Sequence, residues 1–468
     1  MTTWRNPGAF YLYIFCRMRS AFEYSIGYAS RFPSYISSPR ATYGQGLTKF
    51  QKRRKLKQSL LKMVTPRRVA ENTVAFIDHY CQHYYHLFED VRHFEAFKFL
   101  HWGMLSEMPR KSLPAIAKTV GLKDSQTLHH FVREALWNVK AVRETRLWLT
   151  KLFIGKREII LCIDETGDKK KGKVTDYVAR QYISNLGKTE NGIVSVNAYG
   201  VVEGITYPLL FKIFKPRKCL KEGDKYHTKP QLAVKIIREL KKRGFKIKLV
   251  LADSMYCDSG DFIGVLEKLQ MQFIVAIRSN HPMLMSVGSQ KYDNCWQAYQ
   301  QKISHCQSET RFIREIAFSQ RRLLRCYQIS KSSLSNQNGN ENWYIMTNLP
   351  NNIQFIISHF YNIINWIEYG FKQVKNKLGW ADFRLTDYAS IERWWELVFS
   401  AYLLMTIQMT YFQFKSQNAQ QYTEEYSSFM TSDNQDPNLE IGISWNSALK
   451  NLRLILKPYL LLSYSTFV

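Results

Sequence analysis

The chain has 468 residues, of which 45% are hydrophobic and 22% charged. This composition is that of a globular protein and excludes collagen-like, low-complexity and wholly disordered chains. Lysine and arginine together number 66 and aspartate and glutamate 38, so the formal net charge is +28. Such an excess favours a polyanionic partner such as nucleic acid, with a merely basic protein as the alternative. At ~100–200 residues per domain, this length predicts two to four domains.

The sequence contains no apolar run near the ~18 residues that a membrane span needs. The apolar stretch 9–15 is followed by Cys16-Arg17-Met18-Arg19 rather than by a small-residue cleavage site, so we do not interpret it as a signal peptide. The eight cysteines form no C-x-x-C pair, which favours neither a disulfide framework nor a thiolate zinc site. We therefore expect a protein of the reducing cytoplasm without a membrane partner.

Residues 1–62 differ in composition from the rest of the chain. They mix aromatic residues with serine, glycine and proline and close with the basic run 49–57. This pattern predicts a basic, poorly ordered N-terminal extension. Met63 stands where the pattern changes, so we expect a chain that begins there to fold and to bind DNA.

Residues 63–152 predict a helical DNA-binding domain. Within it, 113–122 predicts a short helix closed by Gly121, and Ser125 is the predicted N-cap of the next helix. Two helices around a glycine turn are typical of helix-turn-helix units, and also of plain helical bundles. Three histidines at i, i+4 and i+7 would suit zinc, but their aromatic surroundings favour packing: His79, His83 and His86.

From residue 157 the apolar residues follow the pattern of strands. Strands are predicted over 158–164, 193–202, 208–214, 246–253 and 273–277, and helices over 231–243 and 258–270. This order predicts an α/β (α+β) core with a mixed sheet over residues 153–282. The remaining predicted parts are a β-rich insertion over 283–352, two apolar-rich helices over 353–414, and a polar linker with a last helix over 415–468.

Two predicted strands end in an acid, Asp164 and Asp253. Ligands gather at the carboxyl ends of strands in open α/β sheets, and neighbouring carboxylates suit hard cations such as Mg²⁺. Either aspartate alone is also common as a turn or cap residue. A third acid, Glu368, shares one face of an otherwise apolar helix with Lys372 and Lys375, at i, i+4 and i+7.

These acids resemble the D-D-E triad of RNase H-like transposases. The predicted helix resembles the Y-x2-R-x3-E-x6-K signature of a large group of bacterial insertion-sequence transposases, because it carries Tyr361, Glu368 and Lys375 at the correct spacing. Ile364 stands where that signature has arginine. The resemblance covers about residues 65–462 and also includes the blocks 109–112, 126–131, 164–172, 178–188 and 252–256.

The resemblance implies an RNase H-like core and a DNA transposase. Such an enzyme cleaves the ends of an insertion sequence and joins them to target DNA, using two Mg²⁺ or Mn²⁺ ions. It also implies binding to terminal inverted repeats, a homodimer assembled on DNA, and a nucleoid-associated location in the bacterial cytoplasm. The residues implied in catalysis and metal binding are Asp164, Asp253 and Glu368. Those implied in DNA binding are Tyr361, Lys372, Lys375, Lys171, Arg180 and Lys188.

Two alternatives to a working transposase remain. One is a metal-dependent nuclease of the same fold, and the other is an impaired copy that only binds DNA. Since an arginine could hold a phosphate where Ile364 cannot, we expect Ile364→Arg to raise activity. A nucleotide-binding loop is not favoured, because 167–174 is one residue short of a P-loop, Val174 replaces its hydroxyl residue, and 177–184 predicts a strand.

Overall fold

The computed structural model describes residues 68–172, 174–257, 259–280, 290–291, 296–302, 308–319, 322–331, 342–349, 374–426 and 445–465. The chain divides into two units, Met1–Glu71 and Asn72–Val468. All the helices and strands described below belong to the second unit. Within the described residues, no helix is long and apolar enough to cross a membrane.

The N-terminal part of this unit is helical, as predicted. Its elements are α3 (Ala75–Gln82), η1 (Tyr85–Leu87), α4 (Val91–Leu105), α5 (Leu113–Thr119), α6 (Gln126–Arg133) and α7 (Val139–Ile154). Between α5 and α6, Gly121 adopts a φ of 76°, a conformation that glycine takes without steric cost. Ser125 is the N-cap residue of α6, but its side chain makes no capping hydrogen bond. The Oδ1 of Asp124 instead accepts one from the backbone N of Gln126, at 2.8 Å.

The three histidines of the predicted zinc-like spacing do not share a helix. Helix α3 ends at Gln82, and a short 3-10 turn follows. The ring of His83 packs against Trp148, with 6.1 Å between the ring centroids. This contact agrees with the packing role that the sequence favoured.

The strands form one mixed sheet of eleven strands in the described part of the chain. They are β1 (Ile159–Lys169), β2 (Ala179–Ile183), β3 (Lys188–Val202), β4 (Ile205–Ile213), β5 (Ile247–Ala252), β6 (Phe273–Ile277), β7 (Gln290–Lys291), β8 (Gln297–Lys302), β9 (Ser308–Ser319), β10 (Leu324–Ser330) and β11 (Asn342–Thr347). At its centre the order is β4–β3–β1–β5–β6. The β4–β3–β1 pairs are antiparallel and the β1–β5–β6 pairs parallel. This is the predicted RNase H-like arrangement.

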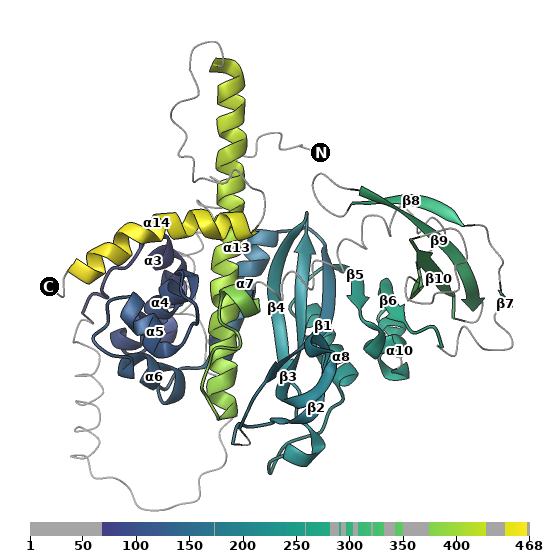
Figure 1. Ribbon diagram of the computed structural model, residues 1–468, viewed down its shortest axis with the longest axis horizontal. Coiled ribbons are helices and arrows are strands. Elements are labelled where there is room, and N and C mark those ends of the chain that lie inside the picture. Colours follow the sequence, from purple (N-terminus) through teal and green to yellow (C-terminus); the bar gives the residue numbers. More distant parts are fainter. Residues whose placement is uncertain are drawn as a thin grey trace, which may run out of the picture. The chain divides into compact units, whose positions relative to one another are not determined.

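The segment predicted as a β-rich insertion extends this sheet. Strand β11 pairs antiparallel with β6, from Tyr344↔Ile277 to Thr347↔Ile274. Strands β10 and β9 then continue the same ladder of hydrogen bonds, visible as green strands in Figure 1. Strand β6 is therefore covered by a neighbour instead of presenting unpaired backbone groups at an edge.

Helices lie against the sheet and against one another. Between the strands lie η2 (Ser184–Leu186), η3 (Arg217–Cys219), α8 (Lys229–Lys242), α9 (Ser254–Cys257) and α10 (Gly260–Lys268), and the chain ends with α13 (Tyr388–Tyr426) and α14 (Trp445–Ser465). Helix α8 packs on β3 and β4. The helix predicted over 258–270 forms as α10, and the short helix α9 precedes it.

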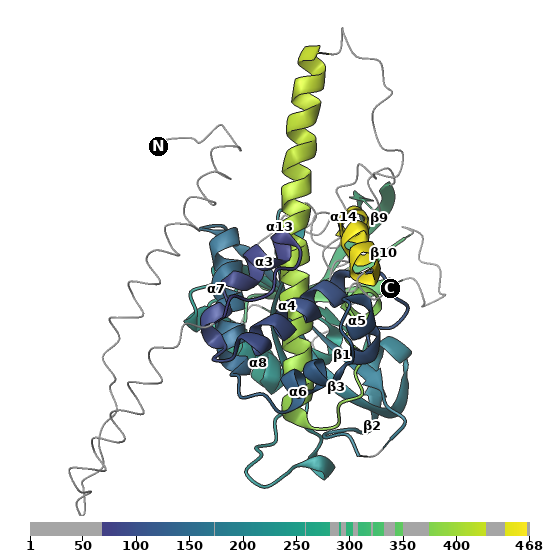
Figure 2. The same cartoon turned by 90° about the vertical axis from the view of Figure 1, so that its left-hand side faces the viewer.

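The long helix α13 lies between the N-terminal helices and the sheet (Figure 1). It packs against α4, α6, α7 and β4, and Figure 2 shows the N-terminal helices grouped around it. A polar linker was predicted from residue 415, yet α13 continues to Tyr426. The reason is that 415–426 holds neither glycine nor proline and contains lysine, glutamine, alanine and glutamate, which favour helices whether or not they are buried.

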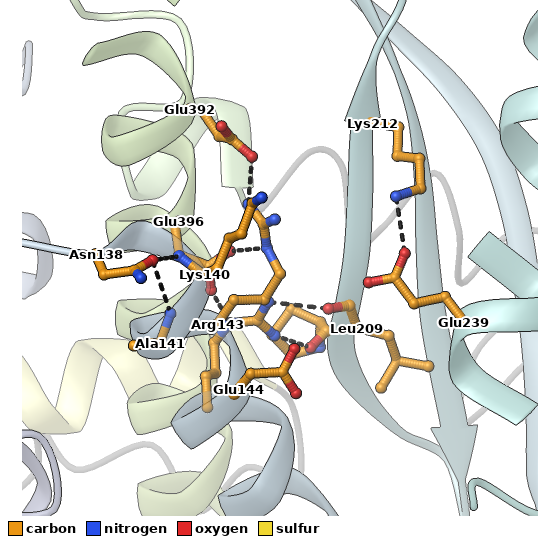
Figure 3. A network of polar contacts seen from close by, with 12 residues as sticks. Asn138, Lys140, Ala141, Arg143, Glu144, Leu209, Lys212, Glu239, Glu392 and Glu396 are labelled. Atoms are coloured by element: carbon orange, nitrogen blue, oxygen red, sulfur yellow. Dashed lines mark hydrogen bonds and ion pairs between the residues drawn. The ribbon is translucent and has the colours of Figure 1, made fainter. Parts of the chain in front are cut away.

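A buried ion network joins α13 to α7 and β4 (Figure 3). Glu396 accepts hydrogen bonds from the Nε of Arg146 at 2.5 Å and from the Nε of Arg143 at 2.9 Å. Arg146 also donates to the carbonyl oxygens of Pro208 and Leu209, at 2.7 and 2.9 Å. Burial alone would raise the pKa of Glu396, but the charges of Arg146 and Arg143 outweigh it and hold that pKa below its ordinary value.

A chain that begins at Met63 is expected to fold. The helices and the sheet described above all lie within Asn72–Val468, so the truncation leaves their packing intact. We expect the truncated and full chains to show the same melting temperature in thermal denaturation. Insoluble expression of the truncated chain, or a melting temperature lower by more than about 5 °C, would contradict the prediction.

Candidate active site

Asp164 and Asp253 occupy corresponding positions on two neighbouring parallel strands. The parallel pairing of β1 with β5 runs up to Ile163↔Ala252, and the two aspartates are the next residues on either strand. Neighbouring strands lie about 4.8 Å apart, so the backbones of the two aspartates lie side by side at this edge of the sheet. The register of the sheet is compatible with the predicted meeting of these acids, which stays a prediction.

The two aspartates differ in how their strands continue. Strand β5 ends at Ala252, and α9 begins directly after Asp253. Strand β1 was predicted to end at Asp164, but it continues to Lys169, because its pairing with β3 extends as far as Lys169↔Gly192. The long strand β3 supplies hydrogen bonds to β1 beyond the point where β5 stops.

Each carboxylate is oriented by the backbone that follows it. Asp164 Oδ1 accepts a hydrogen bond from the N of Glu165 at 2.7 Å, and Asp253 Oδ1 accepts one from the N of Ser254 at 2.6 Å. Asp253 is exposed and Asp164 is half-buried. Both acids are therefore fixed in direction and stand at the boundary between the sheet and solvent.

Tyr256 is a third side chain of this site, which the sequence did not single out. It is fully buried, and its hydroxyl has no hydrogen-bond partner among the described residues. Burial raises its pKa well above the ordinary value, and the charges of Asp164, Glu165 and Asp253 raise it further. Tyr256 is therefore a protonated hydroxyl group close to three acids. The sequence did not reveal this position, although Tyr256 lies in a block that carried the resemblance.

Further acids beside the pair are neutralised by lysines. The Nζ of Lys229, at the start of α8, forms an ion pair with Glu165. The Nζ of Lys375 lies 3.6 Å from the Oδ1 of Asp168 and donates a hydrogen bond to the carbonyl oxygen of Gly167 at 2.9 Å. Burial raises the pKa of Asp168 and lowers that of Lys375, against their mutual attraction. Lys375 thus docks its own short helical segment on β1, just beyond Asp164.

The remaining predicted site residues fall into two groups. Lys171, Arg180 and Lys188 are exposed on or beside β1, β2 and β3. Lys188 makes a surface ion pair with Glu190 at 3.3 Å. The other group lies outside the described residues and comprises Tyr361, Ile364, Glu368 and Lys372.

The chemistry of the acid pair fits a hard divalent cation. Asp164 and Asp253 offer carboxylate oxygens, which Mg²⁺ and Mn²⁺ accept, and neither thiolate nor imidazole stands with them. Among the described residues, no cluster of three or more histidine, cysteine, aspartate or glutamate side chains could hold a metal ion.

An RNase H-like sheet with two adjacent acids at its edge is the framework of a DDE endonuclease. A family model described as DDE superfamily endonuclease matches residues 84–293, which include both aspartates. The chain is also 51% identical over 331 residues to a curated protein of Microchaete diplosiphon, described as a probable transposase for insertion sequence element IS701. That match covers 70% of this chain and 87% of the relative.

The chain belongs to the DDE transposases of insertion sequences. It is an enzyme that acts as a transposase on DNA. The family assignment and the mixed α/β fold predicted from the sequence are therefore confirmed. DDE endonuclease domains generally use divalent metal ions, in agreement with the carboxylate chemistry of the acid pair.

Proposed function

We propose that this protein cuts DNA at the ends of its insertion sequence and joins the freed ends to target DNA, at a site formed by Asp164, Asp253 and Glu368. The observation that carries the proposal is the register of β1 with β5, which sets the two aspartates side by side. Two Mg²⁺ ions, or Mn²⁺, would activate the attacking oxygen and stabilise the leaving oxygen.

The protein's own residues orient the reacting groups. The backbone N–H groups of Glu165 and Ser254 each hold one aspartate oxygen, so the carboxylates do not have to be ordered when the cations and DNA bind. Tyr256 keeps its proton beside these acids. Asp164 would contact both cations, with Asp253 and Glu368 each holding one.

DNA contacts are assigned to exposed basic residues near this edge of the sheet. The phosphate backbone would be held by three exposed residues near the part of β1 that follows Asp164, namely Lys171, Arg180 and Lys188. Lys372 would hold a phosphate at the cleaved end, where Lys375 docks its segment on β1, and Tyr361 would stack on a base there. The α5–α6 unit would bind the terminal inverted repeats, and the assembly on DNA would be a homodimer in the nucleoid of the bacterial cytoplasm.

The decisive experiment is a cleavage and joining assay with the full chain. Linear DNA that carries the element's own ends is incubated with supercoiled target plasmid in Mg²⁺, in Mn²⁺ or in EDTA. We expect end cleavage and joined products with either cation and neither in EDTA. Cleavage without joining would instead identify a nuclease of the same fold.

A variant at Ile364 tests whether this copy is impaired. Binding without cleavage by the unchanged chain, together with cleavage by Ile364→Arg, would identify a DNA-binding copy that has lost activity. If both versions cleave equally at the same melting temperature, the isoleucine is tolerated at this position.

A further inference from the structure

A groove lies between α8 and α10, outside the acid pair. Its volume is about 620 Å³, and the two helices that form its walls pack against each other. The residues that line it are Tyr226, His227, Gln231, Val234, Lys235, Arg238, Gly260, Asp261, Gly264, Val265 and Lys268. Basic, polar and apolar groups thus share its walls.

The groove carries an excess of positive charge. Lys235, Arg238 and Lys268 are all exposed along it, against the single acid Asp261. Lys235 Nζ lies 2.6 Å from His227 Nε2. Burial lowers the pKa of Lys235, and the nearby Lys212 and Lys225 lower it further. Like charges therefore crowd this side of α8, and an anion bound there would relieve their repulsion.

Two glycines leave room for a ligand along the α10 wall. A Cβ added at Gly260 or at Gly264 would meet nothing within 4 Å. Both positions lie on the lining of the groove, where a larger side chain would narrow it. The open wall permits a bulky chain to approach the backbone of α10 closely.

The groove begins at the edge of the sheet that carries the acids. Helix α8 starts at Lys229, which pairs with Glu165, the neighbour of Asp164. Helix α10 follows α9, which begins directly after Asp253. The N-terminal ends of both walls are therefore tied to the acid site, and the groove leads away from it toward Arg238 and Lys268.

We propose that the α8–α10 groove binds the sugar–phosphate backbone of the DNA strand that leaves the acid site. The inference rests on the proposed function, because it takes the acid pair as the point of cleavage. From Lys229 to Arg238 the α8 wall spans about 14 Å at ~1.5 Å per residue. This length accommodates roughly three to five phosphates of one strand.

Gly264 offers a matched set of variants for the test. Gly264→Gln, Gly264→Glu and Gly264→Lys add side chains of similar length but different charge, into space that is open. Each replaces a helical glycine and is expected to hold or raise the melting temperature. DNA binding is measured in EDTA on chains that also carry Asp164→Asn, so that cleavage plays no part. Duplexes with the element's end and unrelated duplexes of the same length are compared.

We expect Gly264→Glu to bind on the order of tenfold more weakly than Gly264→Gln at ~0.15 M salt, and Gly264→Lys at least as tightly as Gly264→Gln. The loss should be the same for both duplexes, because phosphates carry no sequence information. Equal binding by the glutamate and glutamine variants would overturn the inference, and so would a loss confined to element ends. Neither result would alter cleavage by the unchanged chain, which tests the proposed function separately.

Lys235→Gln provides a second measurement with its own control. If Lys235 contacts one phosphate, its replacement lowers the slope of log affinity against log salt by about 0.9. Lys248→Gln removes the same charge from an exposed position near the start of β5, at the opposite end of that strand from Asp253. An equal change in slope for both variants would show a general effect of net charge and would overturn the assignment to the groove.

Discussion

Asp164→Asn is expected to lower the rate of DNA cleavage by about 10³-fold or more while leaving DNA affinity unchanged or slightly higher. The amide keeps the oxygen that accepts from the backbone N of Glu165, so the local fold survives. It loses the charge that holds a divalent cation, and a cation contributes several kcal/mol of transition-state stabilisation. Asp253→Asn should show the same loss, since its position in the sheet matches that of Asp164.

A matched control separates this loss from a general effect of charge. Glu203→Gln removes a carboxylate whose side chain is 68% exposed and which pairs with Arg157. Glu203 follows directly after β3. The last residues of β3 pair with the first residues of β1, so Glu203 lies near the start of β1 and away from Asp164. We expect normal cleavage from this variant. Calorimetric titration with Mn²⁺ should show weaker cation binding for Asp164→Asn than for Glu203→Gln. Unchanged cleavage by Asp164→Asn would show that this acid is not part of the active site.

The pairing of the two aspartates could be predicted from sequence because it depends on a local signal. Each follows a short apolar run, and the residues after such runs in parallel neighbours meet at one edge. The far end of β1 could not be predicted in this way. It depends on hydrogen bonds to β3, which is distant in sequence and continues past the end of β5.

The role of Lys375 shows a different limit of sequence reasoning. Its spacing from Glu368 marked it as a phosphate ligand, but in the structure its Nζ contacts Asp168 and the carbonyl of Gly167. Nothing in the sequence predicts this partner, because Lys375 and Asp168 are far apart in the sequence. The segment 415–426 shows a further limit, because it was predicted as a linker and forms the end of α13. Polar composition indicates exposure but does not determine whether a segment is helical.

The α8–α10 groove illustrates why net charge alone does not identify the surface that binds a polyanion. The net charge of +28 predicted a polyanionic partner without saying where it binds. Many lysines and arginines in this chain are paired internally, for example Lys229 with Glu165 and Lys212 with Glu239. The packing of α8 on α10 gathers exposed cations along the α8–α10 groove.

Glu396→Ala is expected to destabilise the protein by about 3–5 kcal/mol. It leaves the buried guanidinium of Arg146 without its carboxylate and removes one of the two carboxylates that pair with Arg143. The side chains of Arg146 and Glu396 are both 0% exposed, and Arg143 is nearly buried beside them. The loss should appear in urea or thermal denaturation. Since the folded pKa of Glu396 is below its ordinary value, its contribution is complete above about pH 4.3 and disappears as pH falls further.

Glu392→Gln is the matched control for this network. Glu392 lies on the same helix and binds the same Arg143, at 2.8 Å, but its side chain is 18% exposed. Its replacement leaves Arg143 paired with Glu396, so we expect a loss of no more than about 1–2 kcal/mol. Equal losses for the two variants would show that burial of the Arg146–Glu396 pair is not what makes the network sensitive.

The same network links the helical region to the catalytic sheet. Arg146 of α7 contacts the carbonyl oxygens of Pro208 and Leu209 in β4, which pairs with β3, the neighbour of the strand that carries Asp164. Replacing both Arg146 and Glu396 by methionine removes the charges together and should cost less than Glu396→Ala, because no charge is left unpaired. A double variant less stable than Glu396→Ala would show instead that the hydrogen bonds of Arg146 to β4 provide most of the stabilisation.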